Sequence, residues 1–323
     1  MCTAISITAN SHYFGRNLDM EYTNDEHIII IPRNYSFVYR DETIINNHYA
    51  MIGLGIVREN YPLYYDAANE HGLCMAGLNF PHFAVYHSIK MNYHNIAPFE
   101  IIPWILGQCK SVKEAKDLLN NTNVTQISFN KQYPLSPLHW IISDNEESIT
   151  VEPLKDGLHI SHNPVGVLTN SPDFQYHMQN LSNYMHLSIY DPKNNLNPAL
   201  KLQTYSRGMG AIGLPGDLSS ASRFIRAAFT TANAVRHIDE RTQVSQFFHI
   251  LQSVSQTEGC VIVDNKFEKT IYSSCCNAST GTYYYKTYHN HQIKAINMFR
   301  TDLDKRELMQ YKMQWENQII FDN

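Results

Sequence analysis

Hydrophobic and polar residues alternate with a period of two near both ends of the chain and in its middle. Residues 3–8 alternate, Asn10 and Ser11 mark a turn and residues 13–17 return, which predicts a hairpin that carries Cys2 at its free end. The same pattern predicts further strands at 28–31, 140–143, 149–151, 158–160, 270–274, 282–288 and 293–296. Asp156-Gly157 supplies residues that tolerate positive φ at one turn. These strands are enough for two sheets.

Helical spacing fills the intervals between these strands. Ser111 and Glu114 form a capping-box pattern ahead of an apolar face that runs to Leu119. Residues 244–254 follow helical spacing more strongly still. We therefore expect blocks of helices between blocks of strands.

A third helix is expected after the stretch 213–217. Asp217 or Ser219 can cap it, and its apolar positions reach Val235. No linker, repeat or low-complexity tract divides the chain. The arrangement predicts one α+β domain over residues 1–323, with sheets covered by helices, rather than a parallel sheet that alternates strictly with helices.

Composition narrows the classes of partner. The chain has 323 residues, is 43% hydrophobic and carries a net charge of -5 from 25 basic and 30 acidic residues, with no long basic run. This balance argues against nucleic acid and anionic membranes as partners and leaves small molecules or proteins. No apolar stretch approaches the roughly 20 residues of a membrane helix, and the N-terminus does not resemble a signal peptide. We therefore expect a cytoplasmic protein.

Cysteines and histidines give no sign of a metal site. Six cysteines occur without a Cys-x-x-Cys pair, so free thiols are expected and a structural zinc site is not. The 16 histidines are scattered along the sequence. His159 and His162 are three residues apart at a predicted strand end, and we do not expect them to bind a metal. We expect most of the histidines at the surface and predict no metal.

The second residue carries the main chemical hypothesis. Met1-Cys2-Thr3-Ala4 places a thiol where removal of one methionine makes it N-terminal, and a small residue at position 2 suits that removal. The freed α-amine, with a reference pKa of about 7.7 to 8.0, can take the thiol proton directly or through a water. A small buried residue on an N-terminal strand is the alternative interpretation of Cys2.

Two charged residues on the returning strand of the hairpin fit a site around Cys2. The stretch 14–19 contains Arg16 and Asp19, which can lie close to the free end of the chain. A guanidinium beside a thiol favours the thiolate, and a carboxylate can orient an α-ammonium group. An ordinary Arg and Asp at a strand end would give the same local sequence.

Seven motifs, in order along essentially the whole chain, join the N-terminal Met1-Cys2-Thr3 and make the sequence resemble a known family. They are Phe14-Gly15-Arg16-Asn17-x-Asp19, Ala76-Gly77-Leu78-Asn79-Phe80, Leu138-His139-Trp140, 166–172 with Leu168-Thr169-Asn170-Ser171-Pro172, 213–217, Ser222-Arg223-Phe224 and Tyr283-Tyr284-Tyr285. The sequence resembles the choloylglycine hydrolase family, which comprises the bile salt hydrolases and penicillin V acylases of the N-terminal nucleophile superfamily. Together, the order and spacing of the motifs are very specific.

The resemblance implies a four-layer αββα sandwich, in which two antiparallel sheets lie between helical layers and the N-terminal Cys sits in a cleft. It implies Cys2 as nucleophile, with Arg16 and Asp19 as its partners. It also implies that Asn79 and Asn170 form the oxyanion-stabilising region and that Arg223 supports the charged site. A cation at the start of a helix is disfavoured by the helix dipole, so we expect Arg223 to be buried and paired with a carboxylate such as Asp19.

The resemblance further implies hydrolysis of an amide through a Cys2 thioester, with no metal or organic cofactor and with a homotetrameric assembly. A steroid acid joined to glycine or taurine needs a wide apolar pocket. Matching the pocket loops of the family gives the following lining residues: Leu18, Tyr65, Phe129, Tyr133 and Leu138. Ordinary core packing is the alternative for each of them.

Asn79 favours a bile salt hydrolase over a penicillin V acylase within the family, since penicillin V acylases often carry Tyr at that position. The small amide of Asn79 also leaves hydrogen-bonding capacity for the acid group of a conjugate. Arg207, in the loop 205–210, can pair with a glycine carboxylate through two hydrogen bonds, which predicts a preference for glycine conjugates. A penicillin V acylase remains the first alternative. A steroid-binding protein whose Cys2 never becomes N-terminal is the remote one.

Overall fold

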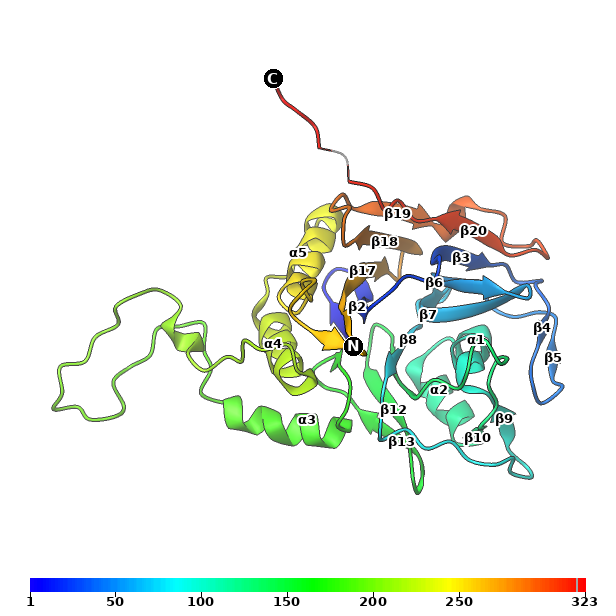
Figure 1. The fold of residues 1–323 in the computed structure, drawn as a ribbon, viewed down its shortest axis with the longest axis horizontal. Coiled ribbons are helices and arrows are strands. Elements are labelled where there is room, and N and C mark those ends of the chain that lie inside the picture. Colours follow the sequence, from blue (N-terminus) through cyan, green and yellow to red (C-terminus); the bar gives the residue numbers. More distant parts are fainter. Residues whose placement is uncertain (318) are drawn as a thin grey trace.

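Two antiparallel sheets face each other in the computed structural model, which describes residues 1–317 and 319–323 (Figure 1). The first sheet has the order β14-β1-β2-β17-β18-β19, from strands β1 (Cys2–Thr8), β2 (His12–Met20), β14 (Val167–Leu168), β17 (Lys269–Asn277), β18 (Thr282–Thr287) and β19 (Lys294–Asn297). The second has the order β13-β12-β11-β8-β7-β6-β3-β20, from β3 (His27–Ile31), β6 (Met51–Arg58), β7 (Tyr61–Asn69), β8 (Cys74–Asn79), β11 (Leu138–Ser143), β12 (Ser148–Leu154), β13 (Gly157–His162) and β20 (Met309–Lys312). Smaller pairs are β4 (Phe37–Val38) with β5 (Ile44–Ile45), β9 (His94–Ile96) with β10 (Thr122–Val124), and β15 (Ile262–Val263) with β16 (Lys266–Phe267).

Helices cover the outer face of each sheet. The first sheet packs against α4 (Ser220–Asn233) and α5 (Glu240–Gln252), with α3 (Phe174–Leu181) beside α4. The second sheet packs against α1 (Ile101–Gln108), next to which lies α2 (Val112–Leu119). Short 3-10 turns are η1 (Pro98–Glu100), η2 (Ser182–Tyr184), η3 (Met209–Ala211) and η4 (Met298–Arg300). The predicted αββα sandwich is confirmed.

The side-chain alternation of β3 shows how one strand serves both layers. Ile28 and Ile30 join the core cluster that contains residues of β1, β2, α4 and α5. Ile29 and Ile31 join the cluster that contains residues of α1 and α2. Because successive side chains of a strand point to opposite faces, an uninterrupted apolar run is what a strand needs when both faces are buried.

The N-terminal hairpin and the three helices lie where the pattern predicts them. Ser219 rather than Asp217 is the N-cap of α4, and the helix ends at Asn233, so Val235 lies outside it. Ser111 caps α2 by accepting from the Glu114 amide, but the Glu114 carboxylate accepts from the Lys110 amide instead of closing a reciprocal box. Most of the predicted strand ranges lie inside the observed strands and are short by one to several residues. The range 282–288 runs one residue past β18, and 293–296 is shifted by one residue from β19.

The prediction omits several elements, among them β6, β7 and β8 of the second sheet and helix α1 of its cover. These strands are buried on both faces over most of their length, so the period of two is lost. Helix α1 has almost no exposed side and contains Pro103 and Gly107, which removes both the helical period and the usual propensity signal.

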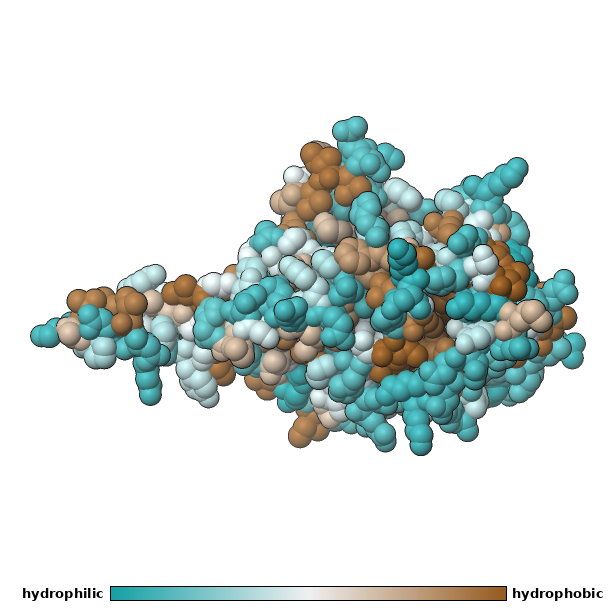
Figure 2. Space-filling view, turned by 90° about the horizontal axis from the view of Figure 1, so that it is seen from below, coloured by the Kyte–Doolittle hydropathy of each residue, from teal (hydrophilic) through white to brown (hydrophobic). Residues whose placement is uncertain are grey.

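One long segment leaves the body of the molecule. Residues 185–208, between η2 and η3, project outward in Figure 1, and Figure 2 shows hydrophobic residues on the projection. Large apolar side chains there are strongly exposed, including those of Tyr190, Leu196 and Tyr205. Within the described residues, no helix has the length and apolarity needed to cross a bilayer.

Candidate active site

The register of the N-terminal hairpin decides which side chains meet. In the β1–β2 ladder Cys2 lies opposite Leu18 and Ala4 opposite Arg16, so these side chains share the face that looks toward the second sheet. Asp19 is three residues from Arg16 and points to the other face, toward α4 and α5. The two charges that the sequence places near Cys2 therefore flank the strand from opposite sides.

Arg16 is buried between the sheets, with 1% of its surface exposed. Its Nη1 donates to the backbone carbonyls of Gly77 and Tyr65, the latter at 3.0 Å, while Nη2 has no hydrogen-bond partner in the part of the chain that the structure describes. Burial works against the charge, but acidic groups around it, Cys2 foremost, outweigh burial and raise the pKa of Arg16. The structure thus places a buried guanidinium near the Cys2 thiol.

Asp66 is the buried carboxylate near Arg16, and the sequence analysis did not find it. Its oxygens accept from the hydroxyls of Tyr272, at 2.8 Å, and Tyr283. Burial raises the pKa of Asp66, and Arg16 opposes that rise. The motif Tyr283-Tyr284-Tyr285 was a signal of the family resemblance, but only the fold shows that its first hydroxyl binds a carboxylate.

Asp19 is held from the opposite face of the sheet. Its carboxylate accepts from Thr270 Oγ1 at 2.6 Å and from Gln256 Nε2 at 3.4 Å, and lies 4.0 Å from Arg223 Nη1. Burial raises the pKa of Asp19, whereas Arg223 lowers it. The carboxylate is thus a fixed, buried acceptor next to the cation that touches the Cys2 backbone.

Arg223 joins the separate parts of this cluster. It is fully buried in the first turn of α4 and donates to Thr3 Oγ1 at 2.6 Å, to Asn170 Oδ1 at 2.7 Å and to the Cys2 carbonyl. The expected burial and pairing with Asp19 are confirmed, although the ion pair is long. Burial lowers the pKa of Arg223 and Asp19 raises it. The guanidinium fixes the backbone of Cys2 relative to the Asn170 side chain.

Asn170 connects the Cys2 nitrogen to the second sheet. Its Oδ1 accepts from the Cys2 N–H at 2.9 Å, and its Nδ2 donates to the carbonyl of Asn79 at 2.7 Å. The backbone N–H of Asn170 donates to Ser220 Oγ at 2.9 Å, at the start of α4. Asn79 therefore enters the site through its backbone, and its side chain is exposed. The amide Nδ2 has a second hydrogen that remains available to a substrate oxygen.

The N-terminal ammonium of Met1 occupies a site of its own. It donates to the Asp19 carbonyl at 2.8 Å and forms an ion pair with Glu268, a residue that is 1% exposed. Burial raises the pKa of Glu268, and the ammonium opposes the rise. Removal of Met1 moves the free amine to the Cys2 nitrogen, which already lies against Asn170 Oδ1. The sequence analysis did not identify Glu268, because nothing local distinguishes it from a surface glutamate.

An apolar cavity of about 350 Å³ adjoins this cluster on the side of the second sheet. Four of the five predicted apolar pocket residues line it: Tyr65, Phe129, Tyr133 and Leu138. The remaining one, Leu18, is buried in the core opposite Cys2 and does not line the cavity. The carbonyls that bind Arg16 belong to cavity residues Tyr65 and Gly77, so the cavity begins where the charged cluster ends.

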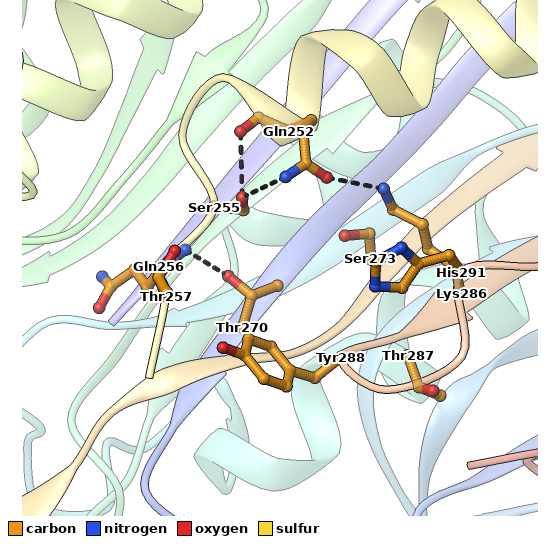
Figure 3. A pocket seen from close by; sticks show the side chains of 10 residues that line it. All are labelled: Gln252, Ser255, Gln256, Thr257, Thr270, Ser273, Lys286, Thr287, Tyr288 and His291. Carbon is orange, nitrogen blue, oxygen red and sulfur yellow. Dashed lines mark hydrogen bonds between the residues drawn. The ribbon is translucent and has the colours of Figure 1, made fainter. Parts of the chain in front are cut away.

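A second cavity, of about 280 Å³, is polar and is lined by two residues that bind Asp19, Gln256 and Thr270 (Figure 3). It is lined by Gln252, Ser255, Gln256, Thr257, Thr270, Ser273, Lys286, Thr287, Tyr288 and His291. The backbone N–H of Gln256 donates to Thr270 Oγ1 at 2.8 Å, and the side chains of both residues donate to Asp19. Since Asp19 faces away from Cys2 and the second sheet, this cavity lies on the other face of β2 from the thiol.

Arg207 is not part of the cluster. It is exposed in the projecting segment of residues 185–208, and none of the contacts of Cys2, Asn170 or Arg223 involves it. No group of three or more His, Cys, Asp or Glu side chains within residues 1–317 and 319–323 is arranged to hold a metal ion. All six cysteines, which lie within the described residues, are free.

Replacing Arg223 by methionine is expected to lower the free energy of unfolding by about 3 to 5 kcal/mol, because Asp19 stays buried without its cation. Urea denaturation followed by circular dichroism measures the change. Arg226→Met is the matched control, since Arg226 lies on the same helix, is half-exposed and donates only to backbone carbonyls. A loss no larger than that of the control contradicts the buried role.

Comparisons with known proteins agree with this architecture. The family described as linear amide C–N hydrolases, choloylglycine hydrolase family, matches residues 2–311. A bile salt hydrolase/transferase of Lactiplantibacillus plantarum is 51% identical over 319 residues, covering 98% of this chain and 98% of that one. The structure of the C2A mutant of the conjugated bile acid hydrolase from Clostridium perfringens superposes with a TM-score of 0.91 at 37% identity, over 100% of both chains. Penicillin V acylase from Agrobacterium tumefaciens, at 17% identity and a TM-score of 0.76 over 96% of this chain and 90% of that one, shares the fold. This chain therefore belongs to the choloylglycine hydrolase family and is a linear amide C–N hydrolase.

Proposed function

We propose that this chain, as one domain over residues 1–323 without Met1, hydrolyses the amide bond between a bile acid and glycine or taurine. The observation that carries the proposal is the apolar cavity of about 350 Å³ next to the charged cluster around Cys2. A steroid needs a largely apolar cavity of this order of size, and the reacting amide needs the polar edge of that cavity. The names of the Lactiplantibacillus and Clostridium relatives support the same substrate class.

The reaction starts with transfer of the Cys2 thiol proton to the α-amine of the same residue. The thiolate attacks the amide carbonyl carbon, and the oxyanion that forms is stabilised by Asn170 Nδ2. The carbon–nitrogen bond breaks as the α-ammonium gives its proton to the leaving amine. Water then attacks the thioester with the α-amine as base, which releases the bile acid and restores the thiol. Arg16 favours the thiolate, and Asp19 with Arg223 keeps Cys2 in register.

Release of the amino acid or acid product from a substrate panel tests the proposal. We expect glycocholate and taurocholate to be cleaved with a specificity constant well above that for penicillin V. The observation in favour of this order is Asn79, whose carbonyl holds Asn170 and whose side chain is exposed. Release of phenoxyacetate at rates that rival glycine release would instead identify a penicillin V acylase. No turnover of any substrate, with Met1 retained in the intact mass, would identify a binding protein.

Replacing Phe129 by alanine is expected to raise KM for glycocholate about tenfold with little change in kcat, because truncating a buried aromatic ring costs binding contacts away from the reacting amide. Steady-state kinetics measures both constants. Phe267→Ala is the matched control, since Phe267 is about half-exposed in β16 and does not line the cavity. Equal kinetics for the two variants would place the steroid elsewhere.

The glycine preference and the homotetramer remain proposals. They are linked because Arg207, on which the glycine preference rests, needs a second copy of the chain to reach a site. Within one chain Arg207 lies on the projecting segment, outside the cluster around Cys2, so it contributes to a site only if that segment meets another copy. Exposed apolar residues on the segment, such as Leu196 and Tyr205, favour such a contact. Specificity constants for matched glycine and taurine conjugates test the preference, and a clear taurine preference contradicts it. The cytoplasmic location stays a prediction.

A further inference from the structure

Two consecutive carbonyls in the segment that carries Asn170 accept hydrogen bonds from buried histidines. His139 Nε2 lies 3.1 Å from the Thr169 carbonyl oxygen, and His177 Nε2 lies 2.8 Å from the Asn170 carbonyl oxygen. Both histidines are fully buried, unlike most histidines of the chain. Because a carbonyl oxygen only accepts, each Nε2 must carry a hydrogen.

The other ring nitrogen of His139 meets a carboxylate. His139 and Glu152 lie on the neighbouring strands β11 and β12, and Nδ1 is 3.0 Å from Glu152 Oε1. With a hydrogen already on Nε2, a neutral ring would turn the Nδ1 lone pair toward the carboxylate oxygens and repel them. The contact is a hydrogen bond only if a proton lies between Nδ1 and the carboxylate, in addition to the hydrogen on Nε2.

The position of Glu152 indicates where that proton lies. Both of its oxygens also accept the backbone N–H of Phe174, each at 3.1 Å, at the first residue of α3. A helix N-terminus and an N–H donor both favour the carboxylate form. The extra proton is therefore on His139, and the two residues form a buried imidazolium–carboxylate pair with side-chain exposures of 0% and 3%.

His177, on helix α3, holds the Asn170 carbonyl from the side of the helices. Its Nε2 carries the hydrogen that meets the Asn170 carbonyl, and its Nδ1 has no hydrogen-bond partner in the part of the chain that the structure describes. Burial lowers the pKa of His177. It stacks on Phe224, the residue after Arg223, at a centroid distance of 4.8 Å, while His139 stacks on Phe80 at 4.1 Å. His177 faces the His139–Glu152 pair from α3, and Arg223 of α4 lies near His177. On the neighbouring strand β13, His159 lies opposite Glu152.

We propose that His139, Glu152 and His177 are positioning residues for the hydrolysis. They fix the backbone of residues 169–170, so that the Asn170 side chain spans the Cys2 nitrogen and the Asn79 carbonyl at hydrogen-bonding distance. They act through Asn170 and not on the substrate. The inference rests on the proposed function. A misplacement of about 1 Å at a reacting group costs on the order of a hundredfold in rate, which is why such a grip affects kcat.

Three substitutions separate positioning from folding. Glu152→Leu and His139→Phe are expected to lower kcat for glycocholate by about 10- to 100-fold with KM within about twofold, after normalisation to the Cys2 thiol titrated by alkylation. Glu152→Gln is expected to stay within about threefold of the wild type, since a glutamine amide donates to Nδ1 while its oxygen still accepts from Phe174. His159→Phe is the matched control, because His159 lies opposite Glu152 on β13 and is exposed. Unchanged kcat in the Leu and Phe variants, or a Gln variant as poor as the Leu variant, overturns the proposal.

A spectroscopic readout tests the proton independently of activity. In protein labelled with ¹⁵N-histidine, one buried ring should carry hydrogens on both nitrogens at neutral pH, and that signal should disappear in Glu152→Gln. A neutral His139 ring overturns the proton assignment. If instead the wild-type enzyme without Met1 releases no amino acid from conjugated bile acids, the proposed function fails while the histidine spectrum is unaffected, so the two failures are distinguishable.

Discussion

Replacement of Cys2 by alanine should lower amino-acid release from conjugated bile acids by at least about a thousandfold, because the nucleophile is lost while the rest of the site remains. Cys2 is 4% exposed, and its backbone N–H and carbonyl are held by Asn170 and Arg223. Neither contact uses the sulfur, so alanine leaves the fold and the position of the α-amine intact. The loss should therefore appear in kcat, with the bile salt still bound. The measurement is glycine release from glycocholate by wild type and variant at equal concentrations of folded enzyme.

The chain offers a matched control for this experiment. Cys260 is an exposed free thiol, so Cys260→Ala removes a cysteine without touching the site. That variant should keep full activity. Intact-mass measurement must show loss of Met1 in every protein, since a retained methionine places the amine on Glu268 and blocks the Cys2 nitrogen. Activity that survives in Cys2→Ala would refute the thioester mechanism.

Local pattern predicted the elements that carry a clear local signal in the sequence. The hairpin of β1 and β2 and the capped helices α2, α4 and α5 show either a turn signal, a cap residue or a clear apolar stripe. The central strands β6 to β8 and helix α1 lie between two packed layers, so their sequences show no period. Their positions follow from tertiary packing, which a window of ten residues does not contain.

The residues of the candidate site likewise fall into those that the sequence identifies and those that only the fold reveals. Residues that belong to motifs were found, and the structure brings Arg16, Asp19, Asn170 and Arg223 around Cys2. Asp19, the partner of Arg223, belongs to a motif, but other carboxylates beside these positive charges were missed, because they come from strands or loops far away in the sequence. Asp66 and Glu268 are examples: each becomes recognisable only when the fold places it beside a buried positive charge. Arg207 is a different case, since the structure places it on the projecting segment outside the cluster, and its role stays a prediction.

Two replacements of Asn170 are expected to separate its two roles, and both have large effects. The Oδ1 atom holds the Cys2 nitrogen and accepts from Arg223, whereas Nδ2 donates to the Asn79 carbonyl and has a second hydrogen for the oxyanion. Asn170→Asp keeps an acceptor toward the amine and Arg223 but removes the donor. Loss of one such donor typically costs about a hundred- to a thousandfold in kcat, so we expect that range with KM little changed.

Asn170→Ala removes the acceptor as well, and should therefore be at least as damaging as Asn170→Asp. It should also slow alkylation of the Cys2 thiol, because the α-amine that takes the thiol proton loses the oxygen that holds it. Asn180→Ala is the control, since Asn180 is a half-buried asparagine on the adjacent helix α3 whose side-chain oxygen accepts from Asn183. If the Asp variant retains wild-type kcat, Nδ2 does not stabilise the oxyanion, and the donor must come from elsewhere at the polar edge of the cavity. If the Ala variant alone is impaired, Asn170 acts by holding the amine, and its contribution to the rate lies in proton transfer.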